Sequence, residues 1–399
     1  MAKYPLLQDL DLKGRRVFVR VDFNVPLKDA SVTDKNRIEA ALPTIQYILE
    51  QGGRCILGSH LGRPEGQRNP KYSLEPVGSA LSELLNKDVV LADDCVGDGP
   101  RTLAQRLRPG EVMLLENLRF HKGEEENSTE FIQKLNELTD VYVSDAFGTL
   151  HRAHASTAGL ARIAPYAGIG LLVQKELQYL EPLRENPPRP FMLVMGGAKV
   201  FDKIALIDHF LDKIDALVIG GAMAYAFLKS GNSPIGKSLC DDKQVALAGR
   251  ILKSIAVRNI RLILPLDHVI AASMTATETK TTVDVNIPEG MAAFDIGPKT
   301  VAAIETALEK IETVFWNGPM GVFEQPAFAK GTFELARIIG ASGAKKLAGG
   351  GDVAAAIGQS GSGDKFDFIS TGGGATLEYL EGKNLPGLKA LEILERGVQ

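Results

Sequence analysis

The sequence predicts an α/β protein with two domains of similar size, each a Rossmann-like parallel sheet covered by helices. Its 399 residues are too many for one ordinary hydrophobic core, and two domains of roughly 200 residues are the expected solution. Short runs of branched apolar residues alternate with longer stretches of helical periodicity, which is typical of parallel strands joined by crossover helices. The loops after these strands change chemistry in mid-chain, from arginine, histidine and asparagine to glycine.

The boundary between the domains is predicted to lie in a helix flanked by glycine and proline. Residues 1–170 form the first domain, 171–186 form an amphipathic hinge helix, and the second domain begins at 187. The other helices that the spacing of apolar residues predicts are 37–53, 74–87, 128–139, 202–214, 242–257 and 299–312.

Composition excludes several classes of function. A net charge of −4 gives no global basic field that would attract nucleic acid or an anionic membrane. Three scattered cysteines are too few for a disulfide framework or a zinc cluster and fit a reduced compartment. The amino terminus lacks a signal peptide pattern, and no apolar run approaches the roughly 18 residues of a membrane span. We therefore expect a cytoplasmic protein with no membrane or nucleic-acid partner.

Glycine-rich loops in the second half indicate phosphate binding. The triple glycine of GGGD (349–352) lets backbone N–H groups approach a polyphosphate, and the helix that follows adds its positive end. Asp352 is placed to hold Mg²⁺, which prefers one or two carboxylates plus phosphate oxygens. A triple glycine alone fits a tight turn equally well, but GGAK (196–199) and STGGG (370–374) in equivalent places favour binding.

Lys199 and Lys203 lie four residues apart and share one face if a helix starts there. Two such ammonium groups repel each other unless an anion lies between them, and the alternative is a pair of solvated surface lysines. The Walker A text GNSPIGKS (231–238) lacks the preceding strand that a P-loop needs, so we interpret it as a surface connection.

The first half places one arginine on each of four separate loops: Arg37, Arg63, Arg119 and Arg152. Guanidinium groups bind phosphate through paired hydrogen bonds, so four converging arginines would hold a small, doubly charged substrate. Three histidines accompany them: His60, His151 and His154. His151 and His154 could equally be structural hydrogen bonders. No Ser-His-Asp spacing or zinc-type histidine cluster is present.

Taken together, these motifs resemble phosphoglycerate kinases. The motifs that carry the resemblance run in family order from residue 22 to about 382: VDFNVP, SHLGRP, ENLRF, DAFGTLHRAHAST, GGAKVFDKI, WNGPMGVFE, GGGD and STGGGATLEYLEG. The family implies a first domain that binds 3-phosphoglycerate or 1,3-bisphosphoglycerate and a second domain, 187–380, that binds Mg-ADP or Mg-ATP. It also implies a tail, 381–399, that packs back on the first domain, and a monomer.

The resemblance assigns substrate contacts in the first half to Asp22, Asn24, Arg37, His60, Arg63, Arg119 and Arg152. Arg37 resembles the arginine that reaches the transferring phosphoryl group, and Asp22 and Asn24 resemble residues that orient substrate oxygens. We predict Arg37 and Lys199 as the catalytic pair.

In the second half the predicted nucleotide contacts are Gly196, Lys199, Lys203, Gly220, Asn317, Glu324, Gly350, Gly351, Asp352 and Val353. Glu324 resembles a ribose contact, and Asp352 the magnesium ligand. The helix N-terminus at Gly372 and Gly373 is predicted to stabilise the transition state. Val353 departs from the family, which usually has threonine or serine there, so a hydroxyl contact is lost.

The resemblance implies the glycolytic reaction in which 1,3-bisphosphoglycerate and ADP give 3-phosphoglycerate and ATP. Phosphoryl transfer of this kind is direct and in line, needs no side-chain nucleophile and follows domain closure. The alternative is a catalytically silent nucleotide-binding protein on the same fold. An NAD-dependent dehydrogenase is disfavoured because no G-x-G-x-x-G follows a strand.

Overall fold

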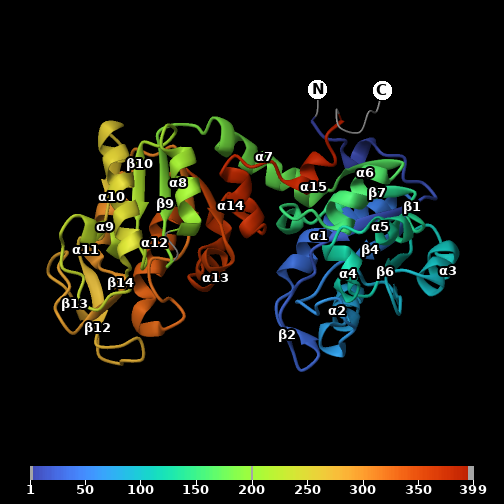
Figure 1. Cartoon of the computed structure of the whole chain (residues 1–399), viewed down its shortest axis with the longest axis horizontal. Coiled ribbons are helices and arrows are strands. Elements are labelled where there is room, and N and C mark those ends of the chain that lie inside the picture. The colour runs from blue at the N-terminus through green and yellow to red at the C-terminus, as the bar shows by residue number, and fades with distance from the viewer. Residues whose placement is uncertain (1–2, 199–200, 394–399) are drawn as a thin grey trace. The chain divides into compact units, whose positions relative to one another are not determined.

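The structure is a computed structural model that describes residues 3–198 and 201–393. The chain forms two compact units. The first holds the chain up to Gln178 and a further segment that begins at Lys383, and the second is Tyr179–Gly382. Each unit is built on its own parallel sheet with helices around it (Figure 1). The predicted fold class, two α/β domains with parallel sheets, is confirmed.

The first domain contains a six-stranded sheet in the order β5-β6-β4-β1-β7-β8. All neighbouring strands run parallel. The strands are β1 (Arg16–Val21), β4 (Arg54–Gly58), β5 (Val89–Leu91), β6 (Val112–Leu114), β7 (Val141–Asp145) and β8 (Tyr166–Ile169). A short hairpin of β2 (Leu27–Lys28) and β3 (Ser31–Val32) lies between β1 and the first helix along the chain.

The helices of the first domain alternate with its strands. They are α1 (Asn36–Glu50), α2 (Glu75–Leu85), α3 (Asp98–Arg106), α4 (Lys122–Glu125), α5 (Thr129–Asn136), a π-helix (Ala155–Gly159), α6 (Leu160–Ile163) and the carboxyl-terminal α15 (Pro386–Lys389). The apolar positions that predicted α1 are its buried face, because Ile38, Ala41, Ile45 and Ile48 are all buried. In α15 the Gly387 N–H donates to the Leu150 carbonyl.

The second domain repeats the plan with the strand order β11-β10-β9-β15-β16-β17, again parallel throughout. These strands are β9 (Phe191–Met195), β10 (Ala216–Ile219), β11 (Arg261–Ile263), β15 (Thr313–Asn317), β16 (Lys345–Gly349) and β17 (Phe368–Ser370). Strands β9, β10 and β15 are buried along their whole length, as expected for a parallel sheet that is covered on both faces.

The helices of the second domain form two groups. In one, α11 (Pro298–Leu308) contacts α12 (Lys330–Ala341), which contacts α13 (Gly351–Gln359); in the other, α8 (Ile204–Phe210) contacts α14 (Gly374–Leu380). Two further helices, α9 (Ala224–Ser230) and α10 (Asp242–Val257), pack together. The Walker-like text 231–238 lies in turns between α9 and α10. Among the described residues, every helix is too short or too polar to cross a bilayer.

A small antiparallel sheet in the second domain was missed by the sequence analysis. It has the order β13-β12-β14 and contains β12 (His268–Ala271), β13 (Lys280–Thr281) and β14 (Ala292–Ile296). Strand β13 has two exposed residues and β12 has only four residues, so neither stands out in the sequence. Strand β14 has five mostly apolar residues, and the sequence analysis overlooked it.

Helix α7 (Leu171–Glu185) occupies the predicted hinge segment, and the division between the two compact units falls inside it, after Gln178. Its first turn is held by a buried side chain of β7. Asp145 Oδ1 accepts hydrogen bonds from the backbone N–H groups of Leu172 (2.9 Å) and Val173 (3.4 Å). Burial raises the pKa of Asp145 to about 7, although these hydrogen bonds oppose the shift.

Asp145 is therefore expected to make stability depend on pH. A carboxyl group whose pKa is higher in the folded than in the unfolded state destabilises the fold increasingly as pH rises through that window. We expect Asp145→Asn, which keeps the accepting oxygen but removes the charge, to raise the free energy of unfolding at pH 8 by about 1–4 kcal/mol. The gain should disappear at pH 4.

Urea unfolding at both pH values measures this effect. Asp140→Asn is the control, because Asp140 is half-exposed and paired with Arg16, so its pKa is lowered and its removal should destabilise at pH 8. Equal unfolding energies for Asp145→Asn and the parent protein at pH 8 would contradict the assignment.

Candidate active site

The polar loops of the first domain meet at one edge of its sheet. Asp22 and Asn24 follow β1, His60 and Arg63 follow β4, Arg119 follows β6 and Arg152 follows β7. These four strands are neighbours in the order β6-β4-β1-β7, and all run in the same direction. Parallel pairing therefore brings residues that are more than one hundred positions apart in the sequence to one surface.

Arg37, in the first turn of α1, reaches the same surface through an ion pair. Its Nη1 lies 2.5 Å from Asp22 Oδ2, and its side chain remains 38% exposed. Asn24 Oδ1 accepts a hydrogen bond of 2.9 Å from the Gly62 N–H and so fixes the loop after β4. Asp22 and Asn24 thus organise this surface even without a ligand.

The imidazole of His60 lies buried among arginine side chains. His60 is buried, and burial together with the charges of four arginines holds its pKa well below the usual value. In order of effect these arginines are Arg20, Arg119, Arg152 and Arg37. Of these four, Arg20 contacts the ring directly, with its Nη2 3.3 Å from His60 Nδ1.

Arg119 is the most enclosed of the predicted arginines. Only 3% of it is exposed, and its Nη1 donates to the Gly62 carbonyl at 2.9 Å. Burial lowers its pKa, with a smaller effect of neighbouring arginines, while Glu125 acts in the opposite direction at 3.2 Å from Nε. Arg63, which follows Gly62 directly, is exposed.

Two histidines close to Arg152 have structural contacts. Arg152 Nε donates to His151 Nε2 at 3.3 Å. His154 is partly buried, and burial and the charges of Arg119 and Arg20 lower its pKa to about 4, so it is neutral at pH 7. The contact with Arg152 fits the structural alternative for His151, whereas the lowered pKa of His154 has the same causes as that of His60, namely burial and arginine charges.

The sequence analysis missed Arg20 as a member of this group. Arg20 lies inside β1, is 1% exposed, and donates from Nε to Ser156 Oγ at 2.7 Å. Its Nη2 lies 3.3 Å from His60 Nδ1. A charged residue in the middle of an apolar strand is rarely buried unless it is paired, and that was the available signal in VFVRVDF.

In the second domain the glycine-rich loops likewise follow neighbouring strands, namely β10, β9, β15, β16 and β17. They touch each other through backbone atoms: Gly197 N–H donates to the Pro319 carbonyl (2.8 Å) and Gly221 N–H to the Met320 carbonyl (3.1 Å). At Gly221, where φ is +61°, a Cβ would lie 2.4 Å from the Gly197 nitrogen. Only glycine permits this approach.

Two predicted residues brace these loops. Lys203 Nζ donates to the Gly196 carbonyl at 2.6 Å and to the Asn317 carbonyl at 3.2 Å. Asn317 Nδ2 donates to the Gly349 carbonyl at 2.6 Å. Gly220 packs so tightly that a Cβ would lie 2.2 Å from Met320 Sδ. Lys199 lies outside the described residues.

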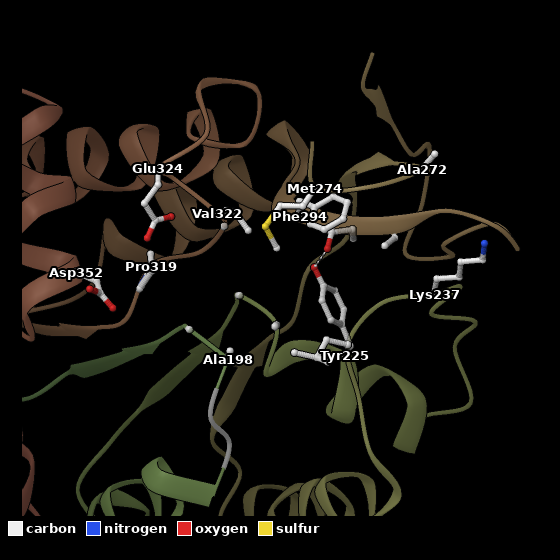
Figure 2. A pocket seen from close by; sticks show the side chains of 17 residues that line it. Ala198, Tyr225, Lys237, Ala272, Met274, Phe294, Pro319, Val322, Glu324 and Asp352 are labelled. Atoms are coloured by element: carbon white, nitrogen blue, oxygen red, sulfur yellow. Dashed lines mark hydrogen bonds between the residues drawn. The ribbon is translucent and has the colours of Figure 1, made fainter. Parts of the chain in front are cut away.

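A cavity of about 560 Å³ opens beside these loops (Figure 2). Glu324 and Asp352 line one end of it, and Lys237 and Ala272 line the other. Between them the wall is largely apolar and includes Tyr225, Met274, Phe294 and Val322. Strand β14 and the loop after β12 supply much of this wall, so the sheet that the sequence analysis missed also forms part of the site.

The remaining predicted residues lie at two helix N-termini. Gly350 precedes α13 with φ of +107°, Gly351 begins the helix, and Val353 in its first turn is fully buried in the core. Gly373 precedes α14 with φ of +54°, and the Gly372 N–H donates to Ser370 Oγ at 3.2 Å.

Asp352 is exposed at the cavity and offers one carboxylate to a cation. Among the described residues, the group of three potential metal ligands is elsewhere, at Asp94, Cys95 and His121 of the first domain. A single carboxylate beside a glycine loop fits Mg²⁺ that is held mainly by phosphate oxygens and water, and does not fit a cage made of protein ligands alone.

Comparison with known proteins shows which family of proteins this chain resembles. A family model described as phosphoglycerate kinase matches residues 7–383. Phosphoglycerate kinases of Anaeromyxobacter sp. (strain K) and Bdellovibrio bacteriovorus are 51% and 48% identical over 96% of this chain, and 98% and 96% of those proteins are covered.

Solved structures of phosphoglycerate kinases are also similar to this chain. The phosphoglycerate kinase of Coxiella burnetii aligns with a TM-score of 0.88 and 41% identity, over 97% of this chain and 98% of that one. The enzyme of Pyrococcus horikoshii OT3 aligns with a TM-score of 0.85 and 32% identity, over 96% of this chain and 98% of that one.

The close backbone contacts at Gly221 lead to a prediction. We expect Gly221→Ala to lower the free energy of unfolding of the second domain by about 1–3 kcal/mol, because a Cβ there meets backbone atoms at a left-handed φ. Gly343→Ala is the matched control, since its Cβ would meet nothing within 4 Å. Urea unfolding of both variants measures the difference; equal stability of the two would refute the packing argument.

Proposed function

This chain belongs to the phosphoglycerate kinase family, and from that premise we propose which residues perform the reaction. The enzyme transfers a phosphoryl group in the glycolytic reaction between 1,3-bisphosphoglycerate and ADP. The observation that carries the assignment of residues is that the loops after β6, β4, β1 and β7, which carry the arginines and the buried His60, share one edge of the first sheet. A catalytically silent nucleotide binder would have no use for that anion site.

The first domain is proposed to bind phosphoglycerate. Arg63, Arg119 and Arg152 would hold the non-transferring phosphate with His60, because guanidinium groups match phosphate geometry with paired hydrogen bonds. Asp22 and Asn24 would orient the hydroxyl and carboxyl oxygens. Arg37, which is partly exposed and held by Asp22, would turn toward the transferring phosphoryl group.

The second domain is proposed to bind the nucleotide in the cavity of Figure 2. The apolar wall with Tyr225 and Phe294 suits a base, and Glu324 suits the ribose hydroxyls. The phosphates would then extend toward Asp352 and the backbone N–H groups of Gly350 and Gly351 at the start of α13.

Further residues complete the proposed nucleotide site. Gly196 and Gly220 keep the loops thin enough for close approach, Lys203 and Asn317 hold them in place, and Lys199 would accompany the phosphoryl group. The helix N-terminus at Gly372 and Gly373 would stabilise the transition state. Mg²⁺, bound through Asp352 and the nucleotide phosphates, would neutralise charge on the phosphate oxygens.

The chemistry requires positioning rather than a protein nucleophile. A nucleotide β-phosphate oxygen attacks the acyl phosphate in line, the carboxylate of 3-phosphoglycerate leaves, and Arg37 and Lys199 stabilise charge on the moving group. Because the two ligands bind to different domains, we propose that transfer follows domain closure, which also excludes water. A cytoplasmic monomer remains our proposal from family membership.

Direct turnover tests the function. Phosphorus NMR with Mg-ATP and 3-phosphoglycerate, with hydroxylamine to trap the acyl phosphate, should show ADP and trapped product only when both substrates are present. Saturable Mg-ATP binding without turnover would instead favour the catalytically silent alternative.

Arg37 provides a prediction for the chemical step. We expect Arg37→Ala to lower kcat by a factor of about 10³–10⁵ with a much smaller change in KM, as for other arginines that act in phosphoryl transfer. Arg101→Ala is the matched control, because Arg101 is also a partly exposed arginine paired with an aspartate, Asp98. Steady-state kinetics decides, and a raised KM with unchanged kcat would make Arg37 a ground-state binder.

Val353 provides a prediction for nucleotide affinity. Valine has no hydroxyl that could donate to a phosphate, and Val353 lies in the first turn of α13, so we expect Val353→Thr to tighten Mg-ADP binding by a factor of about 2–10. The same change replaces a methyl group in the core and should lower the free energy of unfolding by about 1 kcal/mol. Calorimetric titration with Mg-ADP measures the affinity. Val353→Ala is the control that removes core packing without adding a hydroxyl, and it should not tighten binding.

A further inference from the structure

A buried carboxylate lies behind the arginine site of the first domain. Glu124, in α4, has no exposed surface, and its two oxygens accept both donors of Ser156: Oε2 from the backbone N–H at 2.9 Å and Oε1 from the hydroxyl at 2.6 Å. Ser156 lies in the π-helix, whose backbone is further held by Tyr142, because the tyrosine hydroxyl donates to the Ser156 carbonyl at 2.8 Å.

The Ser156 hydroxyl connects this carboxylate to the arginine site. Because its hydrogen is donated to Glu124, its oxygen lone pairs are free to accept, and Arg20 Nε donates to them at 2.7 Å. The order of donors is therefore fixed from Arg20 through Ser156 to Glu124. A carboxylate can accept both Ser156 donors, whereas an amide in its place has one acceptor oxygen and must leave one donor unmatched.

Arg20 in turn determines which ring nitrogen of His60 carries the proton. Its Nη2 lies 3.3 Å from His60 Nδ1, and a guanidinium can only donate. Nδ1 must therefore accept, which places the proton of the neutral imidazole on Nε2. The Asp22 carboxylate lies 3.9 Å from Nδ1, too far for a competing hydrogen bond.

We propose that Glu124 is a positioning residue for the phosphoglycerate site, which acts through Ser156 and Arg20 to hold His60 as the tautomer with its proton on Nε2. An anionic substrate then meets a hydrogen-bond donor on His60 rather than a lone pair. The proposal rests on the proposed function of this site. Glu124 itself is fully buried and does not touch the substrate.

Stability alone is a weak explanation for this arrangement. Burial raises the pKa of Glu124, which means that the fold disfavours the ionised carboxylate. Arg20 and the hydrogen bonds from Ser156 act in the opposite direction but do not cancel the effect of burial. His154 Nδ1 is 4.0 Å from Glu124 Oε1, and the described contacts of the carboxylate at hydrogen-bond length are those with Ser156. The Glu124 carboxylate therefore binds Ser156, the residue that accepts the hydrogen bond from Arg20.

Two variants test the proposal: Glu124→Gln, which keeps the shape but removes one acceptor, and Ser156→Ala, which removes the connection. Both should raise KM for 3-phosphoglycerate about 10- to 100-fold, the range that corresponds to one charge-assisted hydrogen bond, while KM for Mg-ATP stays unchanged. Asp267→Asn is the matched control. Asp267 is also a buried carboxylate that accepts a backbone N–H and a hydroxyl from one residue, Thr300, but it lies in the second domain, so KM for 3-phosphoglycerate should stay at the parent value.

The ring nitrogens of His60 give a readout that loss of stability alone would not change. Nitrogen-15 NMR of the labelled protein, assigned with His60→Gln, should show one neutral tautomer protonated on Nε2 in the parent and in Asp267→Asn. In Glu124→Gln and Ser156→Ala the two tautomers should mix.

The outcomes separate this proposal from the proposed function. A parent protein that neither binds nor turns over 3-phosphoglycerate would overturn the proposed function, while the NMR result would still decide whether Glu124 sets the tautomer. An active parent whose two variants keep the parental KM and a single Nε2–H tautomer would overturn the role of Glu124. An increase of equal size in KM for 3-phosphoglycerate in Asp267→Asn would overturn it as well.

Discussion

Parallel strand pairing is the constraint on which the rest of this structure depends. In each domain it directs the carboxyl ends of neighbouring strands to one edge, so that loops from distant parts of the sequence share a surface. In the first domain, residues from Asp22 to Arg152 meet there, and in the second, loops from Gly196 to Gly373 do. Strand pairing therefore determines where the loops meet, whichever side chains they carry.

We propose that the two edges bind anions in different ways. The first would use charged side chains, which are costly to bury: the pKa of His60 is held low by burial and by surrounding arginines, and that of Arg119 is lowered for similar reasons. The second would use backbone N–H groups and helix ends, which carry no net charge and need no counter-charge. Glycines there bring loops so close that a side chain would collide.

The sequence was sufficient for the parts of the protein that follow from periodicity. The two parallel sheets, α1 with its buried face and the loops that carry Arg119 or GGGD could all be predicted, because strands and helices recur at fixed spacings and unusual loop residues stand out. The antiparallel sheet could not, since β13 has only two residues and both are exposed. With it, the apolar wall that includes Met274 and Phe294 was also missed.

Buried charges show a different limit of sequence reasoning. Arg20 stands out in the sequence only as a charge within an apolar strand, and Glu124 is one acid in a run of glutamates; the fold reveals that both are enclosed. Their connection passes through Ser156, which is 136 residues from Arg20 and 32 from Glu124, so no local pattern could have joined them. Direct ligand contacts depend on residue types that a motif can display. The groups that orient those contacts depend on which elements the fold packs together, and for that reason they emerge only when the side chains are placed in space.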